Sequence, residues 1–233
     1  MVERELKVKE VIQRTYNVRS VRLAVEGEPQ YQAGQFGHFS LKAGKEYRRY
    51  LSFSSSPTEK GYIEFTKKLT ESDFSRLLNL LKPGDALKVA YPQGKFTLEG
   101  SGPKIAFLSG GIGITPIRSM CRYAVDRNLG IDIILLYANH SIKDIVFKED
   151  FDQMQKQYSS LRVSHVLSEP AAGFQCIAGH INAQVIKNQI QDYLQRKFYL
   201  CGPPGMVEAM KKILESELKI SQENIVTENF QGY

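Results

Sequence analysis

Two segments in which an apolar run ends in glycines and continues into a helical pattern constrain this chain most. The first run, residues 105–108, is followed by Ser109-Gly110-Gly111-Ile112-Gly113-Ile114-Thr115-Pro116. The second run, residues 198–201, is followed by Gly202-Pro203-Pro204-Gly205. Glycines at a strand end let the backbone approach a pyrophosphate, and the free N–H groups of the next helix attract its negative charge. Each segment therefore predicts a strand, a turn and a helix that can hold a dinucleotide.

The spacing of the first turn differs from the usual G-x-G-x-x-G pattern. Gly111 and Gly113 are followed by Pro116 at the position where that pattern has its third glycine. One such turn is equally consistent with an ordinary strand-to-helix loop. Two turns of this kind are expected to open on the same carboxyl edge of one sheet, where open α/β folds bind ligands.

Length and composition are those of a globular protein with two modest domains. The chain has 233 residues, of which 42% are hydrophobic and 24% are charged. No stretch approaches the ~20 consecutive apolar residues of a membrane helix, and no apolar signal region follows the charged start. We therefore expect a cytoplasmic protein without membrane insertion. The three cysteines and four histidines show no metal-ligand spacing, so no protein-held zinc or iron–sulfur cluster is expected.

The chain is mildly basic. It carries 31 Lys and Arg against 25 Asp and Glu, a net charge of +6. The basic residues are scattered apart from short pairs such as Lys67-Lys68 and Lys211-Lys212, and no run of aromatic residues alternates with them. A positive net charge is compatible with an acidic partner, but the scattered positions favour solvated surface for most of these residues, and no nucleic acid is expected.

The rhythm of the sequence changes near residue 100. Before it, residues 6–12, 18–25 and 62–66 alternate with period two between short turn signals, which predicts a small antiparallel barrel. One helix is expected over residues 73–81. After it, strands are expected at 105–108, 131–137, 162–167 and 198–201, and helices near 115–127, 146–157, 181–193 and 204–217. This alternation predicts a parallel, doubly wound sheet. The turn at residues 100–103 divides the chain into domains 1–99 and 100–233.

Five motifs, in order, resemble those of the ferredoxin-NADP reductase family over nearly the whole chain. Residues 49–57 are similar to its R-x-Y-S flavin motif with a trailing S-S-P, and residues 75–85 to its pyrophosphate-binding helix and turn. Residues 92–96, 110–116 and 201–204 follow at the family's spacing. The resemblance implies an antiparallel β-barrel domain that binds FAD, followed by an α/β domain that binds NADH or NADPH.

The resemblance also implies roles for single residues in the barrel. Arg49 has a charged fork suited to a pyrophosphate oxygen, and Ser75 at a helix start suits the same anion. Ser52 corresponds to the residue that hydrogen-bonds near flavin N5, the atom that receives hydride. Each has an ordinary alternative: a surface salt bridge for Arg49, a helix N-cap for Ser75, and a bond to a neighbouring carbonyl for Ser52.

Further roles fall in the second domain. Cys201 lies beside the nicotinamide by resemblance, or is a buried core cysteine. Thr115 touches flavin or nicotinamide, or caps the helix ahead of Pro116. The C-terminus resembles the family's closing acidic and aromatic element, in which Phe230 covers the flavin and Glu228 lies near the hydride path. The alternative is a frayed tail.

The full set of implied residues comes from both domains. The implied catalytic residues are Ser52, Cys201, Glu228 and Phe230. The implied cofactor-binding residues are Arg49, Tyr50, Leu51, Ser52, Thr66, Lys68, Phe74, Ser75, Gly110, Gly111, Gly113, Thr115, Pro116, Cys201, Gly202, Pro203, Phe230 and Tyr233.

Leu51 is the clearest departure from the family pattern. It stands where the family has a tyrosine that stacks on the isoalloxazine, so that flavin face is expected to lose an aromatic contact. Tyr50 is adjacent, but in a strand its side chain should point to the opposite face.

The implied function is an FAD-dependent NAD(P)H oxidoreductase. Hydride passes from NAD(P)H to FAD, and electrons pass to an external acceptor such as an acidic ferredoxin, a flavodoxin-like protein, an oxygenase component or a diffusible molecule. A flavin reductase that treats free flavin as substrate, and a flavin-binding subunit of a larger complex, are the alternatives. Glu169 favours NADH because it would repel the 2′-phosphate of NADPH, whereas His140 and Lys143 could bind that phosphate.

Overall fold

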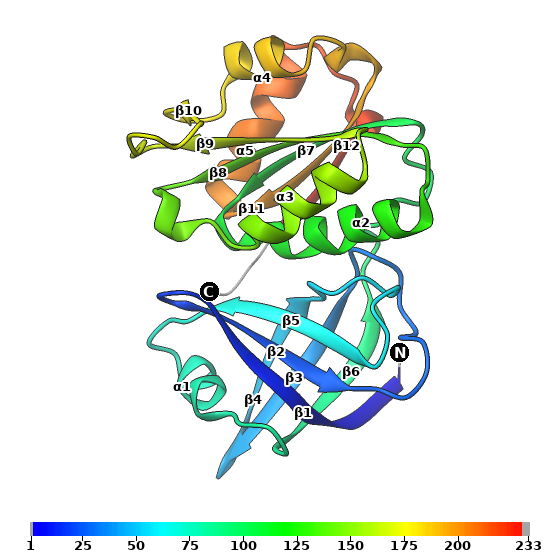
Figure 1. The fold of residues 1–233 in the computed structure, drawn as a ribbon, viewed down its shortest axis with the longest axis vertical. Helices are drawn as coiled ribbons and strands as arrows, with labels where there is room; N and C mark the ends of the chain where they lie inside the picture. The colour runs from blue at the N-terminus through cyan, green and yellow to red at the C-terminus, as the bar shows by residue number, and fades with distance from the viewer. Residues whose placement is uncertain (1, 230–233) are drawn as a thin grey trace.

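The computed structural model describes residues 2–229, so the implied site residues Phe230 and Tyr233 lie outside the described residues. Within that range the strands form two six-stranded sheets, one in each half of the chain. Figure 1 shows the barrel below and the second sheet with its helices above. The expected fold class, an antiparallel barrel followed by a parallel α/β domain, is confirmed.

The first sheet is antiparallel and closes on itself. Its strands lie in the order β4-β3-β6-β1-β2-β5, and a bridge between Phe53 and Phe65 joins the two edges. Period-two alternation turns side chains such as Phe39 and Val89 into the barrel core. The bounds are β1 Val2–Thr15, β2 Val18–Ala24, β3 Phe36–Ala43, β4 Lys45–Ser52, β5 Tyr62–Lys68 and β6 Ala86–Gln93.

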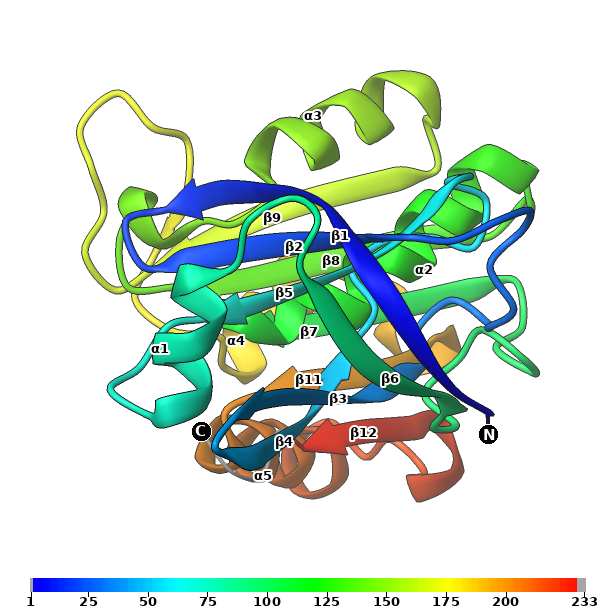
Figure 2. The same cartoon turned by 90° about the horizontal axis from the view of Figure 1, so that it is seen from below.

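A short helix, α1 (Asp73–Leu80), follows β5 and lies at one end of the barrel in both views (Figures 1 and 2). Its side chains Phe74 and Leu78 are buried in the barrel core. Ser72 caps the helix, because its hydroxyl accepts from the N–H of Ser75. The helix expected over residues 73–81 is confirmed.

The second sheet is parallel, in the order β10-β9-β8-β7-β11-β12. Figure 1 shows α2 and α3 between this sheet and the barrel, with α4 and α5 on the other face. Because the strands are covered on both faces, successive side chains enter two separate cores. The bounds are β7 Lys104–Gly110, α2 Ile114–Arg127, β8 Asp132–Asn139, α3 Lys148–Gln157, β9 Leu161–Leu167, β10 Ile177–Ala178, α4 Ala183–Gln189, β11 Lys197–Gly202, α5 Pro204–Lys212 and β12 Ile225–Asn229.

The expected strands of this domain are confirmed, and two helices end earlier than expected. The helix expected at 181–193 is α4, which ends at Gln189. Asp192 accepts hydrogen bonds from Lys104 and Arg196 beyond that end, so tertiary ion pairs hold the chain in a short turn there. The helix expected at 204–217 is α5, followed by a π-helical turn over Ile213–Glu217.

Candidate functional site

The two glycine turns lie side by side, as expected. Cys201 at the end of β11 pairs with Ser109 at the end of β7. A Cβ on Gly113 would lie 2.3 Å from the carbonyl oxygen of Cys201, and one on Gly110 would lie 2.2 Å from Sδ of Met206. Because Gly113 faces backbone atoms, glycine is required there for the turns to pack this closely, whereas the Met206 side chain near Gly110 could move.

A cleft of about 270 Å³ opens between these turns and the barrel. Both domains line it, since Lys68 and Asn17 come from the barrel and Asn139 from the end of β8. Its other walls are formed by the glycine turns and the segment after β8: Gly110, Gly111, Asp144, Val146 and Pro203. Cations and backbone N–H groups in such a cleft suit a bound pyrophosphate.

Thr115 and Pro116 are buried beneath the first turn. Thr115 is 2% exposed, and its hydroxyl donates to the carbonyl of Ile112 at 3.1 Å. It is the second residue of α2, which Gly113 precedes as N-cap, so the capping alternative for Thr115 is wrong. Its contact with a cofactor stays a prediction.

Three implied catalytic residues meet where the two sheets approach one another. The hydroxyl of Ser52 at the end of β4 donates to Oε2 of Glu228 at 3.5 Å. Glu228 lies opposite Cys201 in the β11–β12 register. These side chains come from three strands of two domains. The frayed-tail alternative is wrong for Glu228, because β12 is a hydrogen-bonded strand of the sheet.

Burial controls the protonation of this group of residues. It raises the pKa of Glu228 to about 8, against the opposing effect of the hydrogen bond from Ser52. It also raises the pKa of the Cys201 thiol, and the charge of Glu228 adds to that rise. Cys201 is 0% exposed and belongs to the core, so it remains a thiol rather than a thiolate.

Residues of β4 divide between two faces, as expected for a strand. Leu51 is 4% exposed in the barrel core, whereas Tyr50 is 63% exposed. The Tyr50 ring stacks on His38 with centroids 4.7 Å apart. The predicted opposition of Leu51 and Tyr50 is confirmed, while the contact of either with flavin stays a prediction.

Two cations converge at the seam between β4 and β5. The Arg49 guanidinium lies 5.8 Å from the ring centroid of Phe74 on α1. The pKa of Lys67 is lowered to about 8, mainly by burial and to a smaller extent by the charge of Arg49. An anion held at this seam would relieve the repulsion between the two cations. Lys67 is not among the site residues predicted from the sequence, because its burial depends on packing between residues that are distant along the chain.

Two implied hydroxyls already have partners in the protein. The hydroxyl of Ser75 bonds to the N–H of Thr70 and to the hydroxyls of Thr70 and Ser72, each at 3.1 Å. Ser75 is thus buried behind the cap of α1, and the N-cap alternative for it is wrong. Thr66 bonds to the hydroxyls of Ser20 and Ser54 in a layer between the domains.

Comparison with known proteins shows which family the chain belongs to. Residues 5–98 match the family model described as an oxidoreductase FAD-binding domain, and residues 107–212 match the oxidoreductase NAD-binding domain. The chain is 30% identical to NADH-cytochrome b5 reductase 1 of Dictyostelium discoideum over 235 residues, which cover 96% of this chain and 81% of that one. This chain belongs to the ferredoxin-NADP reductase family.

Other relatives agree in fold or in sequence. The glycine betaine monooxygenase reductase subunit of Pseudomonas aeruginosa is 30% identical over 88% of this chain, which spans 58% of that relative's length. A ferredoxin NADP+ reductase from Neisseria gonorrhoeae with bound FAD and NADP has a TM-score of 0.82 at 20% identity, covering 97% of this chain and 98% of that one. The cytochrome b5 reductase domain of Ulva prolifera nitrate reductase has a TM-score of 0.87 at 20% identity, with 97% of both chains covered.

The residues present fit the cofactors that these domains bind, FAD and NAD. The paired cations at the β4–β5 seam suit the FAD pyrophosphate, and the glycine cradle beside the cleft suits the dinucleotide. Among residues 2–229, no helix combines the length and apolar composition that crossing a bilayer requires.

Proposed function

We propose that this chain is an FAD-dependent reductase that oxidises NADH and passes the electrons to a separate acceptor. The observation that carries the proposal is the meeting of Ser52, Cys201 and Glu228 from both domains, next to the first glycine turn, whose Gly113 packs against the backbone of Cys201. When bound, FAD supplies the ring that takes hydride from nicotinamide and then releases electrons.

The chain's own residues prepare the site for this chemistry. A Glu228 carboxyl with a pKa of about 8 stays mostly protonated at neutral pH, so it places no fixed negative charge where electron density is to arrive. The Ser52 hydroxyl orients that carboxyl. Cys201, buried beside Glu228, adds no charge to the site because burial keeps it a thiol.

The test is the visible spectrum of the purified protein, followed by anaerobic titration with NADH. We expect flavin bands that survive gel filtration and bleach at about one NADH per FAD. A protein that releases its flavin on gel filtration yet turns over free flavin would support the flavin-reductase alternative. Tightly bound flavin with almost no turnover of NADH by artificial acceptors would support the subunit alternative. Flavin that NADH does not reduce would contradict all three.

The expected preference for NADH over NADPH can be tested by substituting a single residue, Glu169. Oε1 of Glu169 lies 3.2 Å from Nε2 of His140, and Nδ1 of His140 lies 2.9 Å from the Ser168 hydroxyl. His140 and Ser168 line the cleft, so Glu169 holds a negative charge at its rim. Replacing Glu169 by Arg should raise kcat/KM for NADPH by about tenfold relative to NADH. The exposed Glu149→Arg is the control, and equal ratios in both variants would contradict the prediction.

The proposal names the electron acceptor only by its class of protein. The relatives' names concern a monooxygenase and cytochrome b5, both of which receive electrons from a reductase. An oxygenase component or a small redox protein is the acceptor that we assign to this chain. Turnover of NADH with such a protein, but not with free flavin, supports this assignment.

A further inference from the structure

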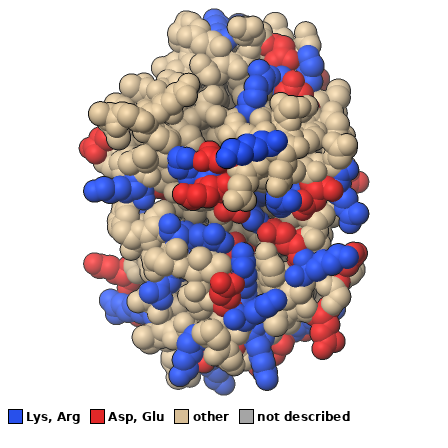
Figure 3. All heavy atoms as spheres, viewed as in Figure 1, with Lys and Arg blue, Asp and Glu red and all other residues tan. Residues whose placement is uncertain are grey.

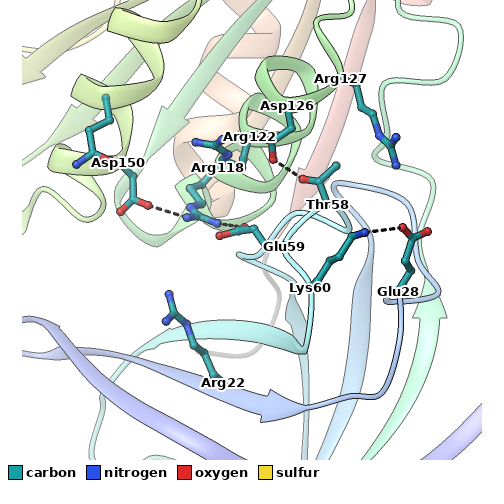
Figure 4. A pocket seen from close by; sticks show the side chains of 11 residues that line it. Arg22, Glu28, Thr58, Glu59, Lys60, Arg118, Arg122, Asp126, Arg127 and Asp150 are labelled. Atoms are coloured by element: carbon teal, nitrogen blue, oxygen red, sulfur yellow. Dashed lines mark hydrogen bonds and ion pairs between the residues drawn. The ribbon is translucent and has the colours of Figure 1, made fainter.

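A layer of charged side chains, each at most 26% exposed, joins the two domains. Its ion pairs alternate in sign across the interface in the order Arg22, Glu64, Arg14, Asp150, Arg118, Glu59. Glu64 is 1% exposed and accepts from Arg14 and Arg22, each at 2.9 Å. Figure 4 shows Arg118 between Asp150 of α3 and Glu59 of the loop after β4. The domains are therefore joined here by ion pairs.

Arg118 is the point at which this layer crosses between the domains. It lies on α2, one helical turn after Thr115, and is 4% exposed. Its guanidinium donates to Oδ1 of Asp150 at 2.6 Å, to the carbonyl of Ser54 at 3.1 Å, and to Glu59. The next residue, Ser119, donates to the carbonyl of Ser55 at 2.6 Å. The helix that follows the first glycine turn is thus fastened to the segment that follows Ser52.

Phe147 connects the same layer to the wall of the cleft. Its ring centroid lies 4.9 Å from the Arg14 guanidinium and 5.6 Å from that of Arg118. Its backbone is left-handed, with φ of 62°, which is unusual for a bulky side chain and is kept only where the surroundings impose it. The residues just before it, Asp144 and Val146, line the cleft. Any shift of one domain would therefore disturb both the charged layer and the cleft.

Ion pairs of this kind specify orientation. Apolar surfaces tolerate sliding, whereas a displaced Arg118 guanidinium is itself left buried without its carboxylate partners, and hydrogen bonds weaken steeply with angle. Hydride transfer in turn depends on the separation of donor and acceptor, and a misplacement of about 1 Å can cost about a hundredfold in rate. We infer that Arg118 is a positioning residue: it fixes the NAD-binding domain against the segment that follows β4 and so sets how nicotinamide approaches flavin. This inference rests on the proposed function.

The chain offers a matched control in Arg196. Its side chain is 1% exposed, and it donates to Oδ1 of Asp192 at 2.6 Å, to Oδ1 of Asp132 at 3.0 Å and to the carbonyl of Ile105 at 3.0 Å. It lies just before β11, at the edge of the sheet opposite the cleft. Arg196→Met thus breaks a comparable set of buried bonds in the same domain, away from the barrel.

The kinetic test compares Arg118→Met with Arg196→Met by rapid mixing with NADH under anaerobic conditions. For Arg118→Met we expect the limiting rate of flavin reduction to fall at least about thirtyfold, with the Kd of NADH within about threefold and FAD content unchanged. For Arg196→Met we expect a lower Tm but a rate within about twofold of the unchanged protein. Equal losses of rate in the two variants, or no loss in Arg118→Met, would overturn the inference.

A second measurement needs no turnover. In the cofactor-free protein, amide hydrogen exchange over residues 54–59 should become faster in Arg118→Met and stay unchanged in Arg196→Met. If Arg118→Met does not fold, Arg118→Lys and Glu59→Gln serve instead. Lysine keeps the charge but cannot reach three acceptors at once, so we expect an intermediate rate. Unaltered exchange in all of these variants would overturn the inference. If NADH does not reduce the unchanged protein, the proposed function fails. The exchange data still show whether Arg118 holds residues 54–59 in place.

Discussion

At the residue scale, β4 presents one aliphatic and one aromatic side chain to opposite sides. Leu51 shares its side of the strand with Arg49 and lies in the barrel core, so we expect it to be the residue that borders flavin. Leu51→Ala should weaken FAD binding about threefold to tenfold, since apolar area is lost at the ring. It should also lower stability by about 2–5 kcal/mol through the cavity it leaves. FAD titration by fluorescence, with thermal unfolding alongside, measures both effects.

Two controls separate those effects. Leu41 is 5% exposed in the same core on β3, so Leu41→Ala should lower stability without changing FAD affinity. Tyr50→Ala should leave both nearly unchanged, because it removes only an exposed contact with His38. A larger loss of FAD affinity in Tyr50→Ala than in Leu51→Ala would place the flavin on the other face of β4.

Glu228 makes a prediction about pH. Its pKa is about 8 in the folded protein, against ~4.3 for an unperturbed glutamate, so between these values the folded state binds more protons than the unfolded state. The free energy of unfolding therefore falls as pH rises through this range. In Glu228→Gln this dependence is absent. Between pH ~5 and ~9 the Tm of the unchanged protein should fall relative to the variant by about 8–16 °C, since about three pH units correspond to about 4 kcal/mol and each kcal/mol to about 2–4 °C. The exposed Glu223→Gln should follow the unchanged protein, and parallel curves for all three would contradict the assignment.

At the element scale, two glycines near helix starts differ in what surrounds them. A Cβ on Gly113 would lie 2.6 Å from Cα of Gly202, whereas in the described part of the chain a Cβ on Gly205 meets nothing within 4 Å. Gly113→Ala should force the two turns apart and lower stability by about 1–3 kcal/mol, together with NADH affinity. Gly205→Ala should be neutral or stabilising by up to ~1 kcal/mol, because it replaces glycine within α5. Thermal unfolding and NADH titration test this pair, and equal effects would show that the turns are not closely packed.

At the scale of the whole molecule, the positive charge is concentrated in the barrel. Residues 1–99 carry 17 Lys and Arg against 12 Asp and Glu, a net charge of +5, whereas residues 100–233 carry 14 against 13. Figure 3 shows basic side chains spread over the lower, barrel half of the face drawn. An acidic acceptor should therefore be steered to the domain that binds flavin.

Steering of this kind depends on ionic strength. With an acidic redox protein as acceptor, kcat/KM should fall at least about tenfold between ~50 and ~500 mM salt. With an uncharged artificial acceptor it should change by less than about twofold. A salt-insensitive rate with the acidic protein would contradict the role of the barrel's charge.

Local patterns determined the architecture. Period-two alternation, the apolar runs and the glycine turns predict strands, helices and a parallel sheet edge through backbone geometry alone, and the strands predicted from them are observed, whereas β10 and β12 were not predicted. The order of the motifs indicated the family and the convergence of Ser52, Cys201 and Glu228. The register of Leu51 and Tyr50 followed from strand alternation.

Tertiary packing decided what depends on contacts between distant residues. Ser75 is buried behind Ser72 because the side chains of α1 pack into the barrel core, and the pKa of Lys67 on β5 is lowered by burial and by the charge of Arg49 on β4. The raised pKa of Glu228 comes from burial between two domains, which no neighbouring residue encodes. Arg118 has no local motif, since its partners Ser54, Glu59 and Asp150 lie 32 to 64 residues away along the chain. Local sequence patterns reflect constraints from residues that are close along the chain. Burial and charge pairing depend instead on which surfaces pack together in the folded protein.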